Sequence, residues 1–476
     1  MVINMKWESV IGLETHVELS TRTKIFCGCT TDFGGEPNTH CCPVCTGQPG
    51  SLPVLNRTAV EYAALAGLAL GCEIHTRSIM ARKHYVYPDL PKAYQTSQFD
   101  RPLCTGGGVT LSNGRRIDLT RIHIEEDAGK LVHTNSELMI DYNRGGVPLI
   151  EIVTEPDFRS AAEAVEYMER LQTTLRAIGV SDCRMQEGSM RCDVNISLRR
   201  PGDTALGVRS EVKNLNSFTA VAAAIEYEYG RQAELLEAGE LVMQDTRAYD
   251  ANTGATVSMR DKENADDYRY FPEPDIVPAE LTRGDIERLR ESLPELPESK
   301  LRRYTEELGV AESDARLLTK YRLVSEYFEC AARVSGSAGA TASFIVTQMF
   351  AHISTESERE RWSPKADAEA LGELLGLVRT GKISRETAKR AYAQMAESGG
   401  RASDFISEAD MEGISAEDLA RLCGQAVEEN PKPAADFRAG REKALQALVG
   451  AVMRQTRGRA DAKAVEAQLR DILPGD

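Results

Sequence analysis

Carboxylate, imidazole and guanidinium side chains recur at every second position along four short segments of this chain. In one segment, Glu14, His16 and Glu18 lie on one side, with Ile11, Leu13, Val17 and Leu19 on the other, and a similar alternation runs through residues 121–125, 191–199 and 208–213. Successive side chains of a β-strand point to opposite faces, so each segment predicts a strand with one apolar and one charged face. Several charged faces side by side would bind divalent metal and phosphate.

The charged positions define one acidic set, which consists of Glu14, His16, Glu125, Glu126, Asp193 and Glu211. Hard oxygen ligands with one imidazole suit Mg²⁺ or Mn²⁺ that bridges phosphate oxygens. A half-buried sheet with a solvated, salt-bridged face alternates in the same way. The alternation by itself therefore leaves that simpler interpretation open.

Two closely spaced pairs of cysteines predict a second kind of metal site. Twelve residues separate the pairs, which are Cys27, Cys29, Cys42 and Cys45. Two thiolate pairs on turns can close a tetrahedral Zn²⁺ site, and four protein ligands are typical of a structural site. His40 or Cys41 stands near enough in the sequence to replace one ligand, and reduced thiols without metal are the alternative.

Residues 82–95 combine cations with tyrosines, and two prolines in this stretch predict a loop rather than a strand. Such a loop can hold phosphates through Arg82, Lys83 and Lys92, and it can stack a base on a ring such as Tyr85. A tyrosine-rich surface loop without a ligand is the alternative.

The composition predicts a soluble, cytoplasmic protein of several domains. The chain has 476 residues, 42% of them hydrophobic and 27% charged, and it contains no apolar run of 18 residues and no apolar secretory signal at the N-terminus. A net charge of −16 argues against non-specific nucleic-acid binding by the whole surface. Residues 432–476 nevertheless carry nine Lys and Arg against six Asp and Glu, so a polyanion can contact this tail.

The elements predict an α+β protein with three domains. A strand-rich catalytic, cradle-like domain spans 1–292, an all-helical domain spans 293–403, and a small helical tail domain spans 404–476. The boundary near 293 follows from Pro294 and Pro297, which cannot both lie inside one helix. Helices are predicted over 57–70, 160–178, 220–238, 298–307, 312–334, 343–352, 366–379 and 384–397.

Several common nucleotide and hydrolase motifs are absent from the sequence. It contains no Gly-x-x-x-x-Gly-Lys-Ser/Thr, no Gly-x-Gly-x-x-Gly, no His-Glu-x-x-His and no Gly-x-Ser-x-Gly. If the protein uses ATP, it therefore binds ATP outside the P-loop and protein-kinase schemes. No cysteine has a local pattern typical of an amidase nucleophile.

The run Ile140-Asp-Tyr-Asn-Arg-Gly-Gly-Val-Pro-Leu-Ile-Glu-Ile-Val153 is a strand preceded by a Gly-Gly turn and by Asn143 and Arg144, which can hold a phosphate. It closely resembles the hallmark motif of the B-subunit family of bacterial aspartyl/glutamyl-tRNA(Asn/Gln) amidotransferases. Further segments resemble that family in the same order along nearly the whole chain: residues 10–19, 123–130, 187–195, 211–217, 267–275 and 443–450.

The resemblance implies an ATP-dependent ligase that amidates misacylated Glu-tRNA(Gln) or Asp-tRNA(Asn). ATP phosphorylates the side-chain carboxylate, and ammonia then displaces the phosphate. The family works with an amidase A subunit and a small C subunit in a heterotrimer, and ammonia passes through an internal channel. Charge on the transferring phosphoryl group calls for Mg²⁺ and cations rather than covalent catalysis. The cysteine set is similar to that of zinc-containing members, which implies a structural Zn²⁺.

On this interpretation Glu14, His16, Glu125 and Glu211 are the principal catalytic metal ligands, with Glu126 and Asp193 beside them. Arg82, Lys83, Tyr85, Lys92, Asn143 and Arg144 are the expected ATP contacts. The tRNA acceptor end is expected at the catalytic domain and the tRNA body at the tail, where the candidate cations are Arg438, Arg441, Lys443, Arg454, Arg457 and Arg459.

Two other functions remain open on the residues alone: a zinc-stabilised tRNA-binding scaffold without catalysis, and a metal-dependent phosphoesterase. The sequence leaves undecided which of the two misacylated tRNAs is the natural substrate. It also does not single out the residues that bind adenine or line the ammonia channel.

Overall fold

The computed structural model describes residues 6–134, 137–261, 268–411, 416–456 and 460–473. Its contacts divide the chain into two compact units, residues 1–296 and 297–476, next to the predicted Pro294–Pro297 boundary. The first unit is rich in strands and the second is helical, which confirms the α+β class. Among the described residues, no helix is long and apolar enough to cross a membrane.

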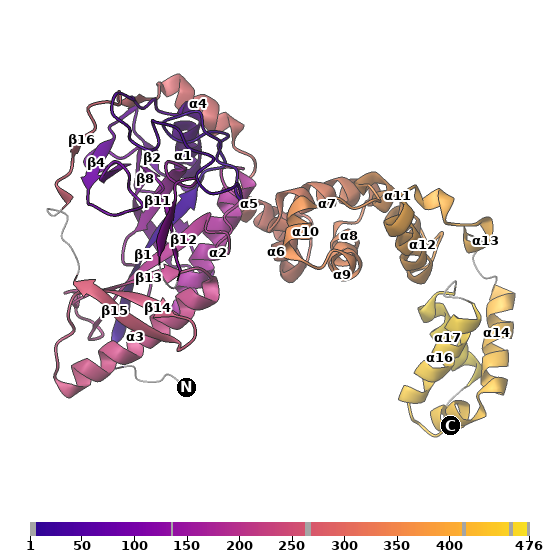
Figure 1. The fold of residues 1–476 in the computed structure, drawn as a ribbon. Coiled ribbons are helices and arrows are strands. Elements are labelled where there is room, and N and C mark those ends of the chain that lie inside the picture. Colours follow the sequence, from indigo (N-terminus) through magenta and orange to yellow (C-terminus); the bar gives the residue numbers. More distant parts are fainter. Residues whose placement is uncertain (1–5, 135–136, 262–267, 412–415, 457–459, 474–476) are drawn as a thin grey trace. The chain divides into compact units, whose positions relative to one another are not determined.

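A ten-stranded sheet forms the centre of the first unit (Figure 1). Its order is β15-β14-β13-β12-β1-β11-β8-β6-β2, with β7 also paired to β8, and β13 and β14 are its parallel pair. The bounds are β1 Glu8–Glu18, β2 Glu73–Ile74, β6 Cys104–Thr105, β7 Gly108–Thr110, β8 Arg116–Glu126, β11 Pro148–Thr154, β12 Met190–Arg199, β13 Ser210–Leu215, β14 Asp245–Asp250 and β15 Ala255–Asp261. The strands predicted from alternation are β1, β8, β12 and β13, and they are confirmed.

Three helices pack with the apolar side chains of this sheet into one core: α1 (Arg57–Ala69), α2 (Ala161–Ala177) and α3 (Phe218–Ala238). They lie close to the predicted ranges. Ser160 caps α2 by accepting a hydrogen bond from the Glu163 backbone N–H, as its capping-box spacing predicts. A fourth helix, α4 (Arg283–Ser292), contacts α1. The apolar face of the sheet is thereby covered, and the charged side chains are left for the other face.

The described residues of the first unit also form three small sheets: β16 (Phe271–Pro272), β4 (Ala81–His84) and β5 (Tyr94–Ser97); β9 (Lys130–His133) with β10 (Leu138–Asp141); and β3 (Arg77–Ser78) with β17 (Ala279–Glu280). The prediction of a loop over 82–95 is therefore wrong at both of its ends. The prolines lie in the connection between β4 and β5, so they leave the flanking residues free to pair.

The second unit begins with α5 (Pro297–Arg302) and a π-helical turn, η2 (Arg303–Glu307). The single helix predicted over 312–334 is wrong. It is broken at Tyr321, whose extended backbone and buried ring separate two helices. The remaining elements are α6 Glu312–Thr319, α7 Arg322–Ser335, α8 Ala338–Phe344, η3 Ile345–Met349, α9 Phe350–His352, α10 Glu356–Arg361, α11 Ala368–Arg379, α12 Arg385–Ser398, η4 Ala402–Asp404, α13 Glu408–Met411, α14 Ala416–Glu429, α15 Pro431–Arg438, α16 Lys443–Gln455 and α17 Ala462–Ile472.

The described residues of this unit form two apolar cores. One runs from Tyr304 to Ile406, and the other runs from Cys423 to Leu473. The contacts place both in one unit, so the predicted division into domains 293–403 and 404–476 stays a prediction.

Candidate active site and metal centres

The strand register brings the predicted charged residues together on one face of the large sheet. Glu14 stands opposite Asp193, and His16 stands opposite Glu151. Glu151 in turn stands opposite His123. The acidic face therefore spans neighbouring strands β12, β1, β11 and β8, as alternation requires.

Glu125 and Glu151 hold two imidazoles between them in a first cluster. His123 Nε2 lies 3.2 Å from Glu125 Oε1 and 3.2 Å from Glu151 Oε2. His16 Nε2 lies 3.5 Å from Glu151 Oε2 and 3.9 Å from Glu125 Oε2. Ser97 Oγ donates to Glu125 Oε1 at 2.7 Å, so strand β5 helps to fix this carboxylate.

The charges of the first cluster shift one another's pKa values. Burial opposes protonation of His123, but Glu151 and Glu125 outweigh it and raise the pKa of His123 to about 9. The same balance raises the pKa of His16. Burial also opposes the charge of Glu151, yet His123 and His16 bring its pKa well below the ordinary range. The carboxylates thus stay charged, and a divalent cation would displace the imidazole protons.

Glu14, Asp193 and Glu211 form a second cluster from β1, β12 and β13. Burial and then the neighbouring carboxylates raise the pKa of Glu14. Lys213 Nζ lies 2.8 Å from Asp193 Oδ2 and 3.1 Å from Glu211 Oε1, so an ammonium group already neutralises part of this cluster.

The predicted set of six metal ligands is therefore divided by the structure. In each cluster the ligand atoms lie within 4.8 Å of one another, and the clusters are His16, Glu125 and Glu151, and Glu14, Asp193 and Glu211. One imidazole with two carboxylates fits Mg²⁺ or Mn²⁺. The predicted set did not include Glu151, which completes the first group, or His123, which lies between the carboxylates of that group. Both were detectable, since His123 alternates with Glu125 and Glu151 stands within the hallmark motif.

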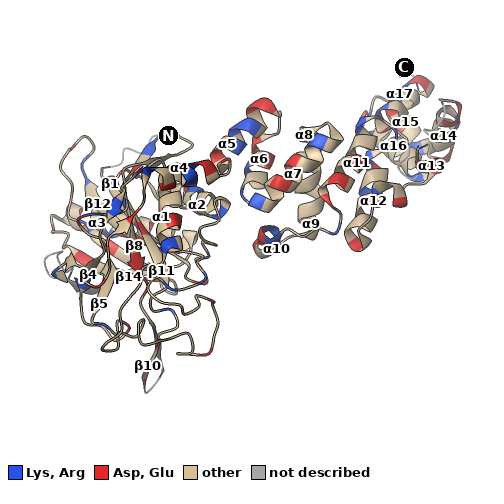
Figure 2. Ribbon diagram, turned by 90° about the horizontal axis from the view of Figure 1, so that it is seen from above, with Lys and Arg blue, Asp and Glu red and all other residues tan. Residues whose placement is uncertain are grey.

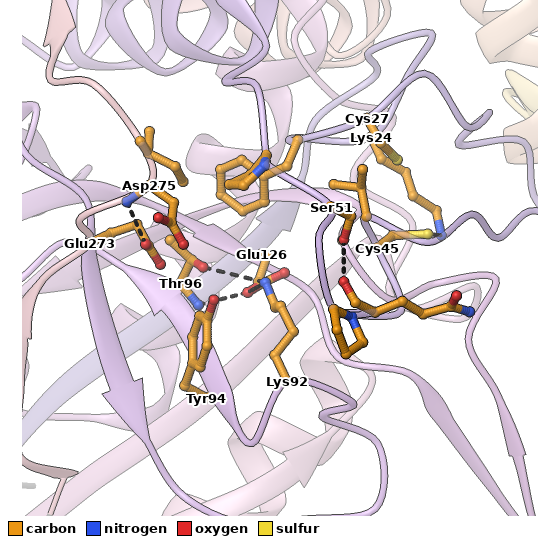
Figure 3. Close-up of a pocket in the computed structure, with 18 of the residues that line it drawn as sticks. Lys24, Cys27, Cys45, Ser51, Lys92, Tyr94, Thr96, Glu126, Glu273 and Asp275 are labelled. Atoms are coloured by element: carbon orange, nitrogen blue, oxygen red, sulfur yellow. Dashed lines mark hydrogen bonds and ion pairs between the residues drawn. The ribbon is translucent and has the colours of Figure 1, made fainter.

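Glu126 belongs to neither cluster. Its carboxylate accepts hydrogen bonds from Lys92 Nζ at 2.5 Å and from the Thr96 backbone N–H at 2.7 Å. Both partners line a cavity of about 230 Å³ next to Cys27 and Cys45 (Figure 3). Lys92 and Glu126 therefore form an ion pair beside this cavity, outside both groups of metal-ligand type.

Arg82 and Lys83 differ in how they are partnered. Arg82 makes two hydrogen bonds to the Glu273 carboxylate, at 2.7 and 2.8 Å, and a third to Asp275 at 3.0 Å. These carboxylates already satisfy the guanidinium group that was predicted to bind phosphate. Lys83 lies 4.8 Å from the Tyr268 ring centre. Burial opposes its charge, but Glu125 and Glu151 are near enough to raise its pKa.

Asn143 and Arg144 hold protein loops. Asn143 Oδ1 accepts from the His40 backbone N–H at 2.8 Å, and Asn143 Nδ2 donates to the Glu36 carbonyl at 2.7 Å, so this amide clamps the cysteine loop. Arg144 donates to the Ala128 and Gly129 carbonyls, each at 3.0 Å. Both side chains thus have partners within the protein, and their contact with ATP stays a prediction.

Four cysteines converge as their spacing predicts. The sulfur atoms of Cys27, Cys29, Cys42 and Cys45 all lie within 4.8 Å of one another, and no cysteine forms a disulfide. Tetrahedral Zn²⁺ with Zn–S bonds of roughly 2.3 Å places sulfurs roughly 3.8 Å apart, and Cys42 Sγ lies 3.9 Å from Cys45 Sγ. Buried Lys24 donates to Cys45 Sγ at 3.7 Å, which suits an anionic thiolate set. The geometry fits zinc.

The helical tail carries exposed cations on α15 and α16 (Figure 2). Arg438, Lys443 and Arg454 are exposed, whereas Arg441 pairs with Asp436 at 3.0 Å. The predicted contacts Arg457 and Arg459 lie outside the described residues.

Comparison with known proteins identifies the family. The model of the GatB/GatE catalytic domain matches residues 9–287, and that of the GatB domain matches residues 326–473. The aspartyl/glutamyl-tRNA(Asn/Gln) amidotransferase B subunit of Ruminiclostridium cellulolyticum is 47% identical over 475 residues, which cover 98% of each chain. The protein of the same name from Caldicellulosiruptor saccharolyticus is 47% identical over 98% of this chain and 99% of its own. That from Thermodesulfovibrio yellowstonii is 45% identical over 98% and 100%. The resemblance found in the sequence motifs is thereby confirmed, and the chain belongs to the GatB family of amidotransferase B subunits.

Proposed function

We propose that this chain is the catalytic B subunit of a tRNA-dependent amidotransferase. It would activate the side-chain carboxylate of misacylated Glu-tRNA(Gln) or Asp-tRNA(Asn) with ATP and then transfer ammonia to it. The observation that carries this proposal is the acidic face, where two groups of metal-ligand type lie on adjacent strands within a domain matched to a catalytic family. A scaffold without catalysis does not explain that face.

Mg²⁺ is the expected cation at this face. His16, Glu125 and Glu151 would hold one ion, and Glu14, Asp193 and Glu211 are candidates for a second. Bound there, Mg²⁺ would neutralise charge on the transferring phosphoryl group. His123 would keep the Glu125 and Glu151 carboxylates oriented, since it donates toward one and lies within 3.2 Å of both. Lys83 would supply a nearby cation.

ATP would lie beside the second cluster. A cavity of about 180 Å³ is lined by Glu14 and Asn195, and its walls include Val10, Pro156 and Leu206. Asn195 Nδ2 donates to Glu14 Oε1 at 2.9 Å, so the cavity shares a wall with the candidate metal ligands. An apolar slot that ends at a metal group fits adenine in the slot and the phosphates at the acidic face. Arg82, Asn143 and Arg144 are not needed for this placement.

Zinc would stabilise the cysteine loop rather than take part in the reaction. Its four ligands would all come from the protein, so no coordination position remains for a substrate. The loop is fastened to the turn at 142–146 by Lys24 and Asn143. The metal would therefore stiffen one wall of the cavity that contains Glu126.

The ammonia would come from a partner. An amidase A subunit and a small C subunit, in a cytoplasmic heterotrimer, are the partners implied by the family. The tRNA body would contact the exposed cations of the tail, and these contacts would weaken with salt.

The test is ADP formation by this chain assembled with its partner subunits, with and without Glu-tRNA(Gln). Glu125→Ala should abolish tRNA-stimulated ADP formation without loss of tRNA binding. Glu73→Ala, which changes an exposed carboxylate on β2 of the same sheet, should leave it intact. ADP formation that ignores tRNA supports a phosphoesterase, and ADP formation that survives Glu125→Ala supports a scaffold whose partner does the chemistry.

A further inference from the structure

Tyr268 and Tyr270 form an aromatic wall with two rings from earlier in the chain, Tyr85 and Phe99. Tyr270 stacks on Phe99 with ring centres 4.3 Å apart and planes 7° from parallel. Tyr268 packs edge-on against Tyr270 at 6.1 Å and against Tyr85 at 6.0 Å. Phe271 belongs to β16, which pairs with β4, so the wall lies along the small sheet visible in Figure 1. We define the aromatic wall as Tyr85, Phe99, Tyr268 and Tyr270.

Lys83 connects this wall to the carboxylates. Its Nζ lies 4.8 Å from the Tyr268 ring centre and 5.9 Å from the Tyr85 ring centre. Glu125 and Glu151 are close enough to act on its charge. Among the described residues, the ammonium group makes no hydrogen bond and no ion pair within 4 Å. A half-buried cation without an acceptor is costly, and it is typical of a site that awaits an anionic or polar ligand.

The aromatic wall is not fully buried within the protein. Phe99 remains 39% exposed, and the adjoining Phe271 remains 44% exposed. Within the described residues, the hydroxyl groups of Tyr85, Tyr268 and Tyr270 make no hydrogen bond. An exposed phenyl ring beside tyrosine hydroxyl groups without a described hydrogen bond suits a flat, polar ligand such as a nucleobase.

We propose that the aromatic wall binds the unpaired 3′-terminal nucleobase of the tRNA acceptor end. This inference rests on the proposed function, since the aminoacyl group is esterified to the ribose of that same nucleotide. The base must therefore lie within one nucleotide of the carboxylate that reacts at the acidic face. Ser97, two residues before Phe99, donates a hydrogen bond to Glu125 at 2.7 Å, so the wall adjoins the first cluster, and Lys83 lies near both.

The chemistry of the wall favours a single-stranded RNA end over a protein partner. Single-stranded bases are recognised by stacking on Tyr and Phe, with cations beside them for the backbone. Exposed Arg269 stands between Tyr268 and Tyr270 in the chain and is a candidate for such a cation. The adenine of ATP could stack on the same rings, and the experiment is designed to separate these two ligands.

The experiment measures binding of a fluorescent acceptor-stem minihelix by the assembled complex, without ATP or glutamine. One minihelix ends in CCA, and the other ends in CC followed by an abasic nucleotide. The protein variants are Tyr268→Leu, which removes the ring, and Tyr268→Phe, which keeps it. Tyr227→Leu on α3 changes an exposed tyrosine away from the wall and serves as the control.

Stacking of one base is worth roughly 1–3 kcal/mol, so Tyr268→Leu should weaken binding of the CCA minihelix roughly 5- to 150-fold. Tyr268→Phe and Tyr227→Leu should bind within about twofold of the natural protein. The abasic minihelix should bind weakly and should lose nothing further with Tyr268→Leu. Tyr85→Leu changes the wall from a different segment and should repeat the loss if the first variant folds poorly.

Binding of ATP by the same variants is measured separately. Three results would overturn the inference: equal binding of the CCA minihelix by Tyr268→Leu and the natural protein, an equal loss with the abasic minihelix, or weakened ATP binding by Tyr268→Leu with RNA binding kept. The last result would assign the wall to the adenine of ATP. Because binding is measured without turnover, failure of ATP-dependent amidation would refute the proposed function and leave this binding result standing. Likewise, unchanged minihelix binding by Tyr268→Leu would refute the assignment of the wall and leave the proposed function standing.

Discussion

Glu151→Gln is the most informative single change at the acidic face. Glu151 lies within 3.5 Å of His16 and 3.2 Å of His123, and it is 8% exposed. The substitution keeps the shape and a hydrogen-bond acceptor but removes the charge. Its effect therefore measures how far the carboxylates, rather than packing, hold the two imidazoles protonated in the metal-free protein.

The size of the effect follows from His123. Raising its pKa from 6.5 to about 9 corresponds to about 3 kcal/mol. Two carboxylates, Glu125 and Glu151, supply this at equal distances of 3.2 Å. Loss of one carboxylate should remove about half of this stabilisation, so the pKa of His123 should fall by about one pH unit or more. A raised histidine pKa stabilises the fold below pH 6.5, and this stabilisation disappears as the pH rises through about 9. In the variant it should disappear at lower pH.

The assay is a pH titration of the histidine side chains by nitrogen-edited NMR in metal-free protein. Glu126→Gln is the matched control, because Glu126 adjoins Glu125 in sequence but pairs with Lys92. Glu151→Gln should also lower tRNA-stimulated ATP cleavage by roughly 100-fold, as expected for loss of a metal ligand. The reasoning is refuted if His123 still titrates near 9 in Glu151→Gln, or if Glu126→Gln lowers its pKa equally.

Three further predictions concern the cysteine loop and the pH dependence of stability. Cys42→Ser should release zinc, measured by metal analysis, and lower the unfolding temperature, whereas Cys41→Ser should keep one zinc per chain because Cys41 is outside the four-sulfur group. Asn143→Ala should lower the unfolding temperature, since it removes about 1–3 kcal/mol of hydrogen bonding to the cysteine loop. The KM for ATP should stay unchanged if Asn143 acts only on this loop, and a raised KM would identify Asn143 as an ATP contact. Burial and then Asp127 raise the pKa of Glu18 to about 8, so the folded protein keeps a proton that the unfolded chain has released, and stability should fall as the pH rises from 4.5 to about 8. Glu18→Gln should flatten that fall in urea unfolding, and an unchanged slope would contradict this assignment.

Most of the acidic face could be predicted from the alternation of polar and apolar residues along the strands. It placed Glu14, His16, Glu125 and Asp193 on strands and on the correct side of the sheet, because a half-buried strand leaves no other arrangement. The cysteine spacing likewise predicted convergence of four sulfur atoms. Local sequence rules are sufficient where a single strand or turn fixes where the side chain points.

The order of the strands could not be read in the same way. Which carboxylates meet depends on β11 lying between β1 and β8, and this neighbour relation places Glu151 between His16 and His123. The partners of cations depend on equally distant contacts: Arg82 meets Glu273, 191 positions later. A cation that is predicted to bind phosphate from its charge alone can therefore already be paired with a carboxylate from a distant segment of the chain.

The most direct test of carboxylate activation traces oxygen from the glutamate side chain of the tRNA into the released phosphate. Glu-tRNA(Gln) labelled with ¹⁸O in the side-chain carboxylate is converted by the assembled complex with ATP and glutamine, and the released phosphate is analysed by mass spectrometry. Phosphorylation of the carboxylate followed by displacement with ammonia predicts one ¹⁸O atom in each phosphate, and loss of this signal in Glu125→Ala. Unlabelled phosphate formed alongside amidated tRNA would contradict activation of the carboxylate by ATP at this face.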